Sequence, residues 1–109
     1  MKRGDFMKIL LCCKAGVSCN MFASTLKDEA DKQNLDVVIW ATPETAIEYS
    51  IKSANLILIT PQIASSIKKV KDLANPNTPI YIISDDDFQS FNAKKVLEEA
   101  LAKYNTKNI

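Results

Sequence analysis

Residues 8–20 read "KILLCCKAGVSCN", in which an apolar run passes into a turn of small residues and then into a predicted helix. Residues 8–13 have the length and the continuous apolar character of a buried strand. The residues from 18 or 19 to 33 predict a helix, since Phe22, Leu26 and Ala30 recur on one face. A strand that leads directly into a helix is half of a β-α-β unit, which favours a parallel sheet.

The rest of the chain repeats this alternation of apolar runs and amphipathic stretches. Each of two Thr-Pro pairs, at 42–43 and 60–61, predicts a helix with threonine as the N-cap and proline at the first helical position. We therefore predict an α/β fold of three layers, a four-stranded parallel sheet flanked by helices on both faces, in a single domain spanning residues 1–109. Residues 1–7 are expected to be a loose N-terminal tail. The further strands are expected at 36–41, 55–59 and 79–84, and the further helices at 42–52, 60–73 and 92–105.

Composition argues against several classes of function. The formal net charge is only +1, whereas a nucleic-acid partner normally requires a strongly basic face, so we expect no nucleic acid. No apolar run approaches the ~20 residues that cross a bilayer, and we expect no direct membrane insertion. The start of the chain lacks the apolar segment of a signal peptide. We therefore expect a cytoplasmic protein whose three cysteines stay reduced.

The chain contains no histidine. This excludes the Cys–His and Ser–His–Asp arrangements of nucleophilic hydrolases and most catalytic zinc sites. Proton transfer near neutral pH would then need a carboxylate, a lysine or a thiol with a perturbed pKa. We expect neither a metal nor another cofactor.

The loop after the first strand predicts an anion site. Ligands of parallel sheets bind beyond the carboxyl ends of the strands, and Cys13 stands at that end. Gly16 permits a tight curl, and the first turn of the following helix offers unpaired N–H groups and the positive end of its dipole. This field binds phosphate and lowers the pKa of a thiol, so Cys13 is our candidate nucleophile, held as a thiolate. The candidate phosphate-binding residues are Lys14, Ala15, Gly16, Val17, Ser18, Cys19 and Asn20, with Ser18 and Asn20 as side-chain donors.

The other two cysteines have plainer interpretations. Cys12 lies within the apolar run, and adjacent strand residues point to opposite faces, so we interpret it as a small core residue. Cys19 either packs at the helix start, lines the phosphate loop, or pairs with Cys13 under oxidation. A buried strand end also accommodates a structural cysteine, so the residues alone leave both interpretations of Cys13 open.

Four segments resemble the enzyme IIB subunits of the phosphoenolpyruvate-dependent sugar phosphotransferase system, lactose/cellobiose type. The segment "LCCKAGVSCN" (11–20) is similar to the family's strand followed by Cys-x-x-Gly-x-Ser, which places the phosphorylated cysteine at Cys13. The stretch Phe88–Ala93 departs from the Tyr-Gly and Asp-Gly pattern of many members. The other similar segments are "ATPETA" (41–46), "ILITPQIASSI" (57–67) and "TPIYIIS" (78–84).

This resemblance implies a phosphotransferase. Cys13 would accept a phosphoryl group from a phosphohistidine on a IIA partner. It would pass the group to a sugar of the cellobiose, chitobiose or lactose class, bound by the membrane-embedded IIC partner. The missing histidine agrees with this role, because the histidine of the relay belongs to the donor. Phosphoryl transfer needs mainly positioning and electrostatic stabilisation, which the amides of residues 14–20 can supply without a metal.

Three other classes share parts of the pattern. Low-molecular-weight tyrosine phosphatases and related arsenate reductases carry a cysteine loop on a similar sheet, but they need Cys-x5-Arg, and Cys19 occupies the arginine position. A thiol redox protein using Cys13 and Cys19 lacks the Cys-x-x-Cys spacing. A response-regulator-like module would need an aspartate where the chain has Thr60. The segment Asp85–Asp87 could mimic the general acid of a phosphatase. We interpret it as a solvated acidic turn.

Overall fold

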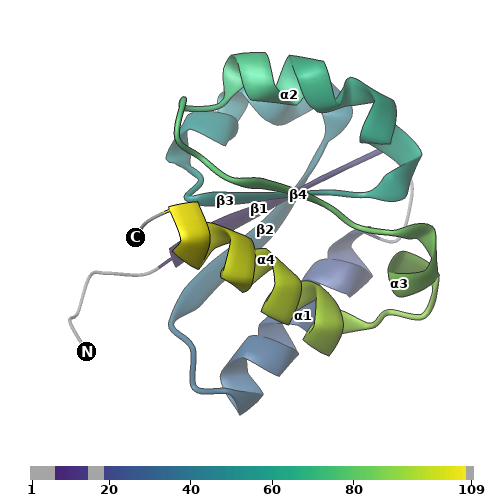
Figure 1. Cartoon of the computed structure of the whole chain (residues 1–109). Helices are drawn as coiled ribbons and strands as arrows, with labels where there is room; N and C mark the ends of the chain where they lie inside the picture. Colours follow the sequence, from purple (N-terminus) through teal and green to yellow (C-terminus); the bar gives the residue numbers. More distant parts are fainter. Residues whose placement is uncertain (1–6, 15–18, 108–109) are drawn as a thin grey trace.

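The computed structural model describes residues 7–14 and 19–107, which form a four-stranded sheet between two layers of helices (Figure 1). All strand pairs are parallel, and the order is β2-β1-β3-β4, so the first strand is an inner one. This arrangement confirms the predicted fold class. The strands are β1 (Met7–Cys13), β2 (Val37–Pro43), β3 (Leu56–Ile59) and β4 (Ile80–Ile82).

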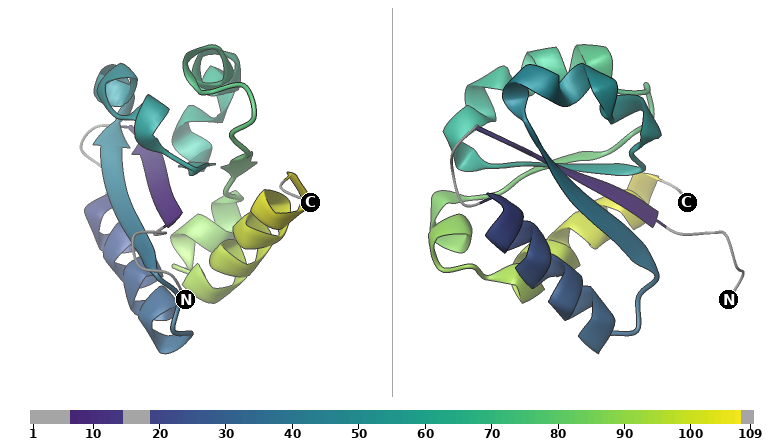
Figure 2. Two further views of the ribbon diagram at one scale, coloured as in Figure 1. Left: turned by 90° about the vertical axis from the view of Figure 1, so that its left-hand side faces the viewer. Right: turned by 180° about the vertical axis from the view of Figure 1, so that it is seen from behind.

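Helices cover both faces of the sheet (Figure 2). On one face lie α1 (Cys19–Lys32), α3 (Asp85–Gln89) and α4 (Ala93–Lys107). On the other face α2 (Ile67–Leu73) lies with three 3-10 helices. No helix within residues 7–14 and 19–107 is both long and apolar enough to cross a membrane. The 3-10 helices are η1 (Glu44–Tyr49), η2 (Ile51–Ser53) and η3 (Pro61–Ser66).

Strand β1 is hydrogen-bonded along both of its edges. Leu10 lies in register with Trp40 of β2 on one side and with Ile57 of β3 on the other. The ladder toward β3 extends past the strand ends, because the amide of Asn55 donates to the Lys8 carbonyl oxygen at 2.8 Å. A strand held in this way cannot shift its register without breaking two ladders at once.

The side chains of β1 alternate between two separate cores. Leu11 and Cys13 pack with the residues of α1 and α4, whereas Leu10 and Cys12 pack with those of η1, η3 and α2. The covered sheet explains why its strands are continuous apolar runs. On the α1 side, the predicted stripe of Phe22, Leu26 and Ala30 is confirmed, since each is fully buried.

The two Thr-Pro pairs have different outcomes. Thr60 is the N-cap of η3 with Pro61 at its first position, as predicted. Thr42 is not an N-cap, because β2 continues through Pro43, whose extended backbone makes it the cap residue of η1. The segment after it forms two short 3-10 helices, and the predicted helix at 42–52 is to that extent wrong. Proline restricts its own φ but permits both a strand end and a helix start, so sequence alone did not separate the two cases.

The acidic segment after β4 corrects a prediction. Residues Asp85–Asp87 begin α3, and the Ser84 hydroxyl caps this helix by accepting from the Asp87 amide at 3.1 Å. Asp87 is buried, with one carboxylate oxygen 3.4 Å from Lys95 Nζ and the other accepting from Asn92 at 3.4 Å. The segment is therefore a capped helix with an internal ion pair, and only its first two aspartates are exposed.

The stretch Phe88–Ala93 is anchored by aromatic rings. Phe22 of α1 lies edge-on to Phe88 and Phe91, with ring centroids 5.3 and 5.6 Å away. Phe91 has φ of 53°, a left-handed conformation that is uncommon for a bulky residue. The ring contacts hold this backbone in place, and they join the segment after β4 to the first turns of α1.

Burial of the α1 stripe predicts a stability difference within one helix. Leu26→Ala should lower the free energy of unfolding by about 2–5 kcal/mol, because it leaves a cavity in the core. Met21→Ala is the matched control, since Met21 is 61% exposed and should change stability by less than about 0.5 kcal/mol. Urea denaturation followed by circular dichroism measures both. Equal losses in the two variants would contradict the described orientation of α1.

Candidate functional site

Cys13 is the last residue of β1, at the edge where the carboxyl ends of all four strands meet. Its side chain is buried, with 5% of its surface exposed, and it belongs to the core on the α1 side. Its Sγ atom lies 3.6 Å from the carbonyl oxygen of Thr42 in β2. A reduced thiol can donate a weak hydrogen bond to that oxygen, whereas a disulfide sulfur carries no proton to donate.

The sulfur atoms of Cys13 and Cys19 are joined in a disulfide bond. Cys19 is the first residue of α1 and is 4% exposed, and the two Cα atoms are 6.4 Å apart. The expectation that all three cysteines are free thiols is therefore wrong for this pair and correct for Cys12. The physical reason is that the first residue of α1 lies beside the last residue of β1, within the distance that a disulfide spans.

Cys12 is a core residue, as predicted. It is fully buried, and it packs in the opposite core from Cys13, with Leu10 and Ile59 among its neighbours in that cluster. Burial raises the pKa of the Cys12 thiol to about 12. The two adjacent cysteines thus have different surroundings, and only one lies beside α1.

The remaining candidate phosphate-binding residues flank this pair. Lys14 directly follows β1 and is exposed, and Asn20, in the first turn of α1, is also exposed. Ala15, Gly16, Val17 and Ser18 lie outside the described residues. The first turn of α1 has no acidic side chain, so nothing in that turn offsets the positive end of the helix dipole.

Thr60 was not among the candidates for this site, although it lies beside the end of β1. Its amide donates to the Cys12 carbonyl oxygen at 3.1 Å. Its hydroxyl oxygen is buried and has no hydrogen-bond partner within the described part of the chain. The sequence singled out Thr60 as an N-cap and as the position where a response regulator has an aspartate, and its place directly after an apolar strand was the signal that could have assigned it to this edge.

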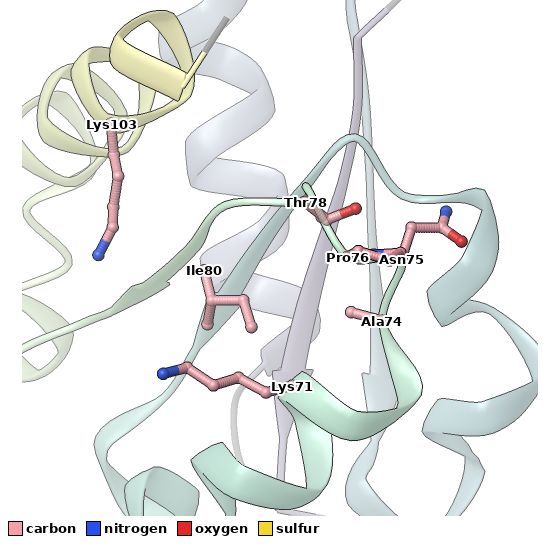
Figure 3. Close-up of a pocket in the computed structure, with 7 residues that line it drawn as sticks. All are labelled: Lys71, Ala74, Asn75, Pro76, Thr78, Ile80 and Lys103. Atoms are coloured by element: carbon pink, nitrogen blue, oxygen red, sulfur yellow. The ribbon is translucent and has the colours of Figure 1, made fainter.

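Two cavities lie outside the cysteine pair itself. A cavity of about 320 Å³ is lined by Lys71, Lys103 and Ile80, among others (Figure 3). Ile80 begins β4, so this cavity is at the amino edge of the sheet, opposite Cys13. A second cavity, of about 430 Å³, lies between α1 and β2 and includes Asn20 and Trp40 in its lining. Neither cavity has a cysteine in its wall.

Comparison with known proteins gives a consistent family. Residues 8–99 match the family described as "PTS system, Lactose/Cellobiose specific IIB subunit". The chain is 28% identical over 98 residues to the PTS system oligo-beta-mannoside-specific EIIB component of Bacillus subtilis (strain 168). That alignment covers 87% of this chain and 93% of the relative.

Two solved structures are also similar. The solution structure of the cellobiose-specific phosphotransferase IIB component from Borrelia burgdorferi has a TM-score of 0.76 and 30% identity, over 96% of this chain and 97% of that one. The lactose-specific IIB component domain from Streptococcus pneumoniae has a TM-score of 0.80 and 19% identity, over 91% of this chain and 98% of that one. The second likeness supports the fold alone.

The surroundings of Cys12 predict its reactivity. A thiol with a pKa of about 12 is only about one part in ten thousand thiolate at pH 8, and the thiolate is the reactive form. Iodoacetamide at pH 8 should therefore leave Cys12 unmodified in the folded protein and modify it in urea. Peptide mass mapping of both samples makes the measurement. Rapid modification of Cys12 without urea would contradict its placement in the core.

The unpartnered hydroxyl of Thr60 predicts the effect of its removal. Thr60→Val should leave the free energy of unfolding unchanged or raise it by about 1 kcal/mol, because it removes a buried donor that makes no hydrogen bond within residues 7–14 and 19–107. Thr42→Val is the matched control, since the Thr42 side chain is also buried but contacts the Pro43 carbonyl oxygen. A clear loss of stability in Thr60→Val, measured by urea denaturation, would show that the hydroxyl has a partner.

Proposed function

This chain belongs to the lactose/cellobiose-specific IIB family of the phosphotransferase system, and from this membership we propose that it carries a phosphoryl group on the sulfur of Cys13. IIB components of this system act as phosphotransferases in sugar phosphorylation and transport. The position of Cys13 carries the proposal. It ends an inner strand at the edge where parallel α/β sheets bind ligands, beside the first residue of α1.

The proposed reaction transfers one phosphoryl group in two steps. In the first, the reduced sulfur of Cys13 attacks the phosphorus of a phosphohistidine on a IIA partner. The S–P bond forms as the N–P bond breaks, and the released imidazole nitrogen takes up the thiol proton. In the second, a hydroxyl oxygen of the sugar, held by a membrane IIC partner, attacks the same phosphorus. The O–P bond forms as the S–P bond breaks, and the released Cys13 sulfur takes up the hydroxyl proton, which restores the thiol.

The start of α1 would stabilise the negative charge of a phosphoryl group on Cys13. A phosphoryl group brings about −1.5 to −2 charges and three acceptor oxygens. The first-turn N–H groups of a helix have no partner within the helix, and they lie at the positive end of its dipole. We assign the cradle to residues 14–20, of which Lys14, Cys19 and Asn20 are described. Their amides and the Asn20 side chain supply donors without a metal.

The composition of this cradle favours a carrier over a phosphatase. Phosphatases of similar architecture hold the transferring group with a bidentate arginine six positions after the cysteine, and this chain has Cys19 there. A carrier must also release the group to its next acceptor, and a very tight phosphocysteine complex would slow that step. The missing arginine therefore suits onward transfer.

The substrate, partners and location follow from the same role. The matched family is described as lactose/cellobiose specific, and two relatives are named as specific for oligo-beta-mannosides and for cellobiose, so we propose a sugar of the cellobiose, chitobiose or lactose class. The partners are a IIA phosphodonor and a membrane IIC transporter. A carrier between these two components acts in the cytoplasm.

Substitution of the acceptor tests the proposed function. Cys13→Ser should accept no stable phosphoryl group, because a serine hydroxyl remains protonated and is a weak nucleophile at neutral pH. Cys12→Ala is the matched control and should accept the group as the unchanged chain does, since Cys12 faces the opposite core. Intact mass after incubation with a phosphohistidine-bearing IIA protein and a reductant gives the result. A phosphorylated cysteine in Cys13→Ser would assign the acceptor elsewhere.

A further inference from the structure

We propose that Cys13 and Cys19 form a reversible disulfide under peroxide, which removes the acceptor sulfur from phosphoryl transfer while it lasts. The inference rests on the proposed function, because it assigns a regulatory modification to the same sulfur atom. The observation behind it is the bond between the two sulfurs at the junction of β1 and α1. Cys19 acquires a role that the carrier chemistry does not use, as the resolving cysteine.

The backbone places this pair within reach of a disulfide. The Cα atoms of Cys13 and Cys19 are 6.4 Å apart, inside the ~4.4–6.8 Å range that disulfides span. The two residues are six positions apart and belong to different elements, so each is held by its own strand or helix. The closure therefore joins two ordered ends and needs no rearrangement of the sheet.

The pairing is selective among the three cysteines. Cys12 precedes Cys13 directly, yet its side chain packs in the opposite core, and the sheet itself lies between the two. Burial also keeps Cys12 in its unreactive protonated form at neutral pH, with a pKa of about 12. Oxidation at this strand end therefore leads to Cys13 and Cys19 and leaves Cys12 free.

The oxidation balances with a peroxide as the oxidant. The Cys13 thiolate attacks one peroxide oxygen, so an S–O bond forms, the O–O bond breaks, and one water leaves. The Cys19 sulfur then attacks the Cys13 sulfur, so the S–S bond forms, the S–O bond breaks, and a second water leaves. Two thiols lose two electrons and two protons to one peroxide. A small dithiol reverses the change through a mixed disulfide.

A disulfide at this position and a phosphoryl group on Cys13 exclude each other. Both need the same electron pair of the Cys13 sulfur, and a disulfide sulfur has no thiolate to offer. Disulfides in the cytoplasm are as a rule transient, and those that form there are usually catalytic or redox-sensing. Sugar uptake through this carrier would then stop during peroxide stress and resume on reduction.

Peroxide treatment of the full chain tests the inference. After treatment with hydrogen peroxide the protein should lose the mass of two hydrogens, and peptide mapping without reductant should link Cys13 to Cys19. Phosphate uptake from a phosphohistidine-bearing IIA protein should fall to less than roughly a tenth of that of the reduced protein. Dithiothreitol should restore it. Cys12→Ala is the matched control and should behave identically.

Removal of the resolving cysteine gives the second arm. Without a partner sulfur, Cys13 should gain oxygen atoms in excess peroxide and pass to the sulfinic acid, which dithiothreitol does not reduce. The variant is Cys19→Ser, or Cys19→Ala if the serine variant unfolds. After peroxide and then dithiothreitol, its phosphoryl uptake from the IIA protein should stay below roughly half of its own untreated value, because over-oxidation is irreversible. The ratio within each variant makes the result independent of its basal rate.

The outcomes separate the two proposals. If the reduced protein takes up phosphate but peroxide adds oxygen to the unchanged chain, or leaves uptake intact, the disulfide inference is overturned and the carrier function stands. If the disulfide forms and reverses but the reduced protein takes up no phosphate on Cys13, the carrier function is overturned, and the switch with it. Full recovery of the Cys19 variants after excess peroxide would overturn the resolving role.

Discussion

Hydrogen bonding along both edges of β1 fixes the register of the sheet and the place where Cys13 ends its strand. β1 lies between β2 and β3, and its side chains enter both cores, so its end is fixed relative to three elements. The two hydrogen-bond ladders of β1 therefore set the backbone position of Cys13. The first residue of α1, Cys19, lies at the same point, where its sulfur is bonded to that of Cys13.

Two opposing influences act on the sulfur of Cys13. The start of α1 favours a negative charge, and its first turn contains no carboxylate that would offset this field. The Thr42 carbonyl oxygen lies 3.6 Å from the same sulfur and can accept a hydrogen bond from it only when Cys13 is a reduced, protonated thiol. The sulfur of Cys13 thus lies between a carbonyl oxygen of β2 and the first residue of α1.

The sequence predicted the fold well in segments with a single clear hydrophobic pattern. The apolar runs at 8–13 and 55–59 and the stripe of Phe22 and Leu26 became buried strands and a buried helix face, since burial decides such patterns. The predicted boundary between strand and helix was wrong at Thr42-Pro43. This pair permits either a strand end or a helix start, and its pairing with β1 makes it part of the strand. The acidic segment hid a Ser-x-x-Asp cap, in which Ser84 accepts from the Asp87 amide, and this signal was available but outweighed by the charge.

The site was predictable in part. Separating Cys12 from Cys13 needed only the alternation of strand residues, and the structure places Cys12 in the opposite core. The bond between Cys13 and Cys19 depended on how closely the chain returns on itself, which the six-position spacing does not state. The buried hydroxyl of Thr60 depended on the register of β3 against β1, a contact between residues far apart in sequence. Long-range geometry of this kind is not readable from local composition.

The inner position of β1 also determines when its two hydrogen-bond ladders can form during synthesis on the ribosome. Ile9 pairs with Leu56, so the strand that carries Cys13 gains its second neighbour only after the chain through β3 has been synthesised. Until then the nascent chain can form one ladder at most, with β2, and has an uncovered edge. The surroundings of Cys13 therefore arise late, as a property of the assembled sheet, and a truncated chain that stops before residue 56 has no means to build them.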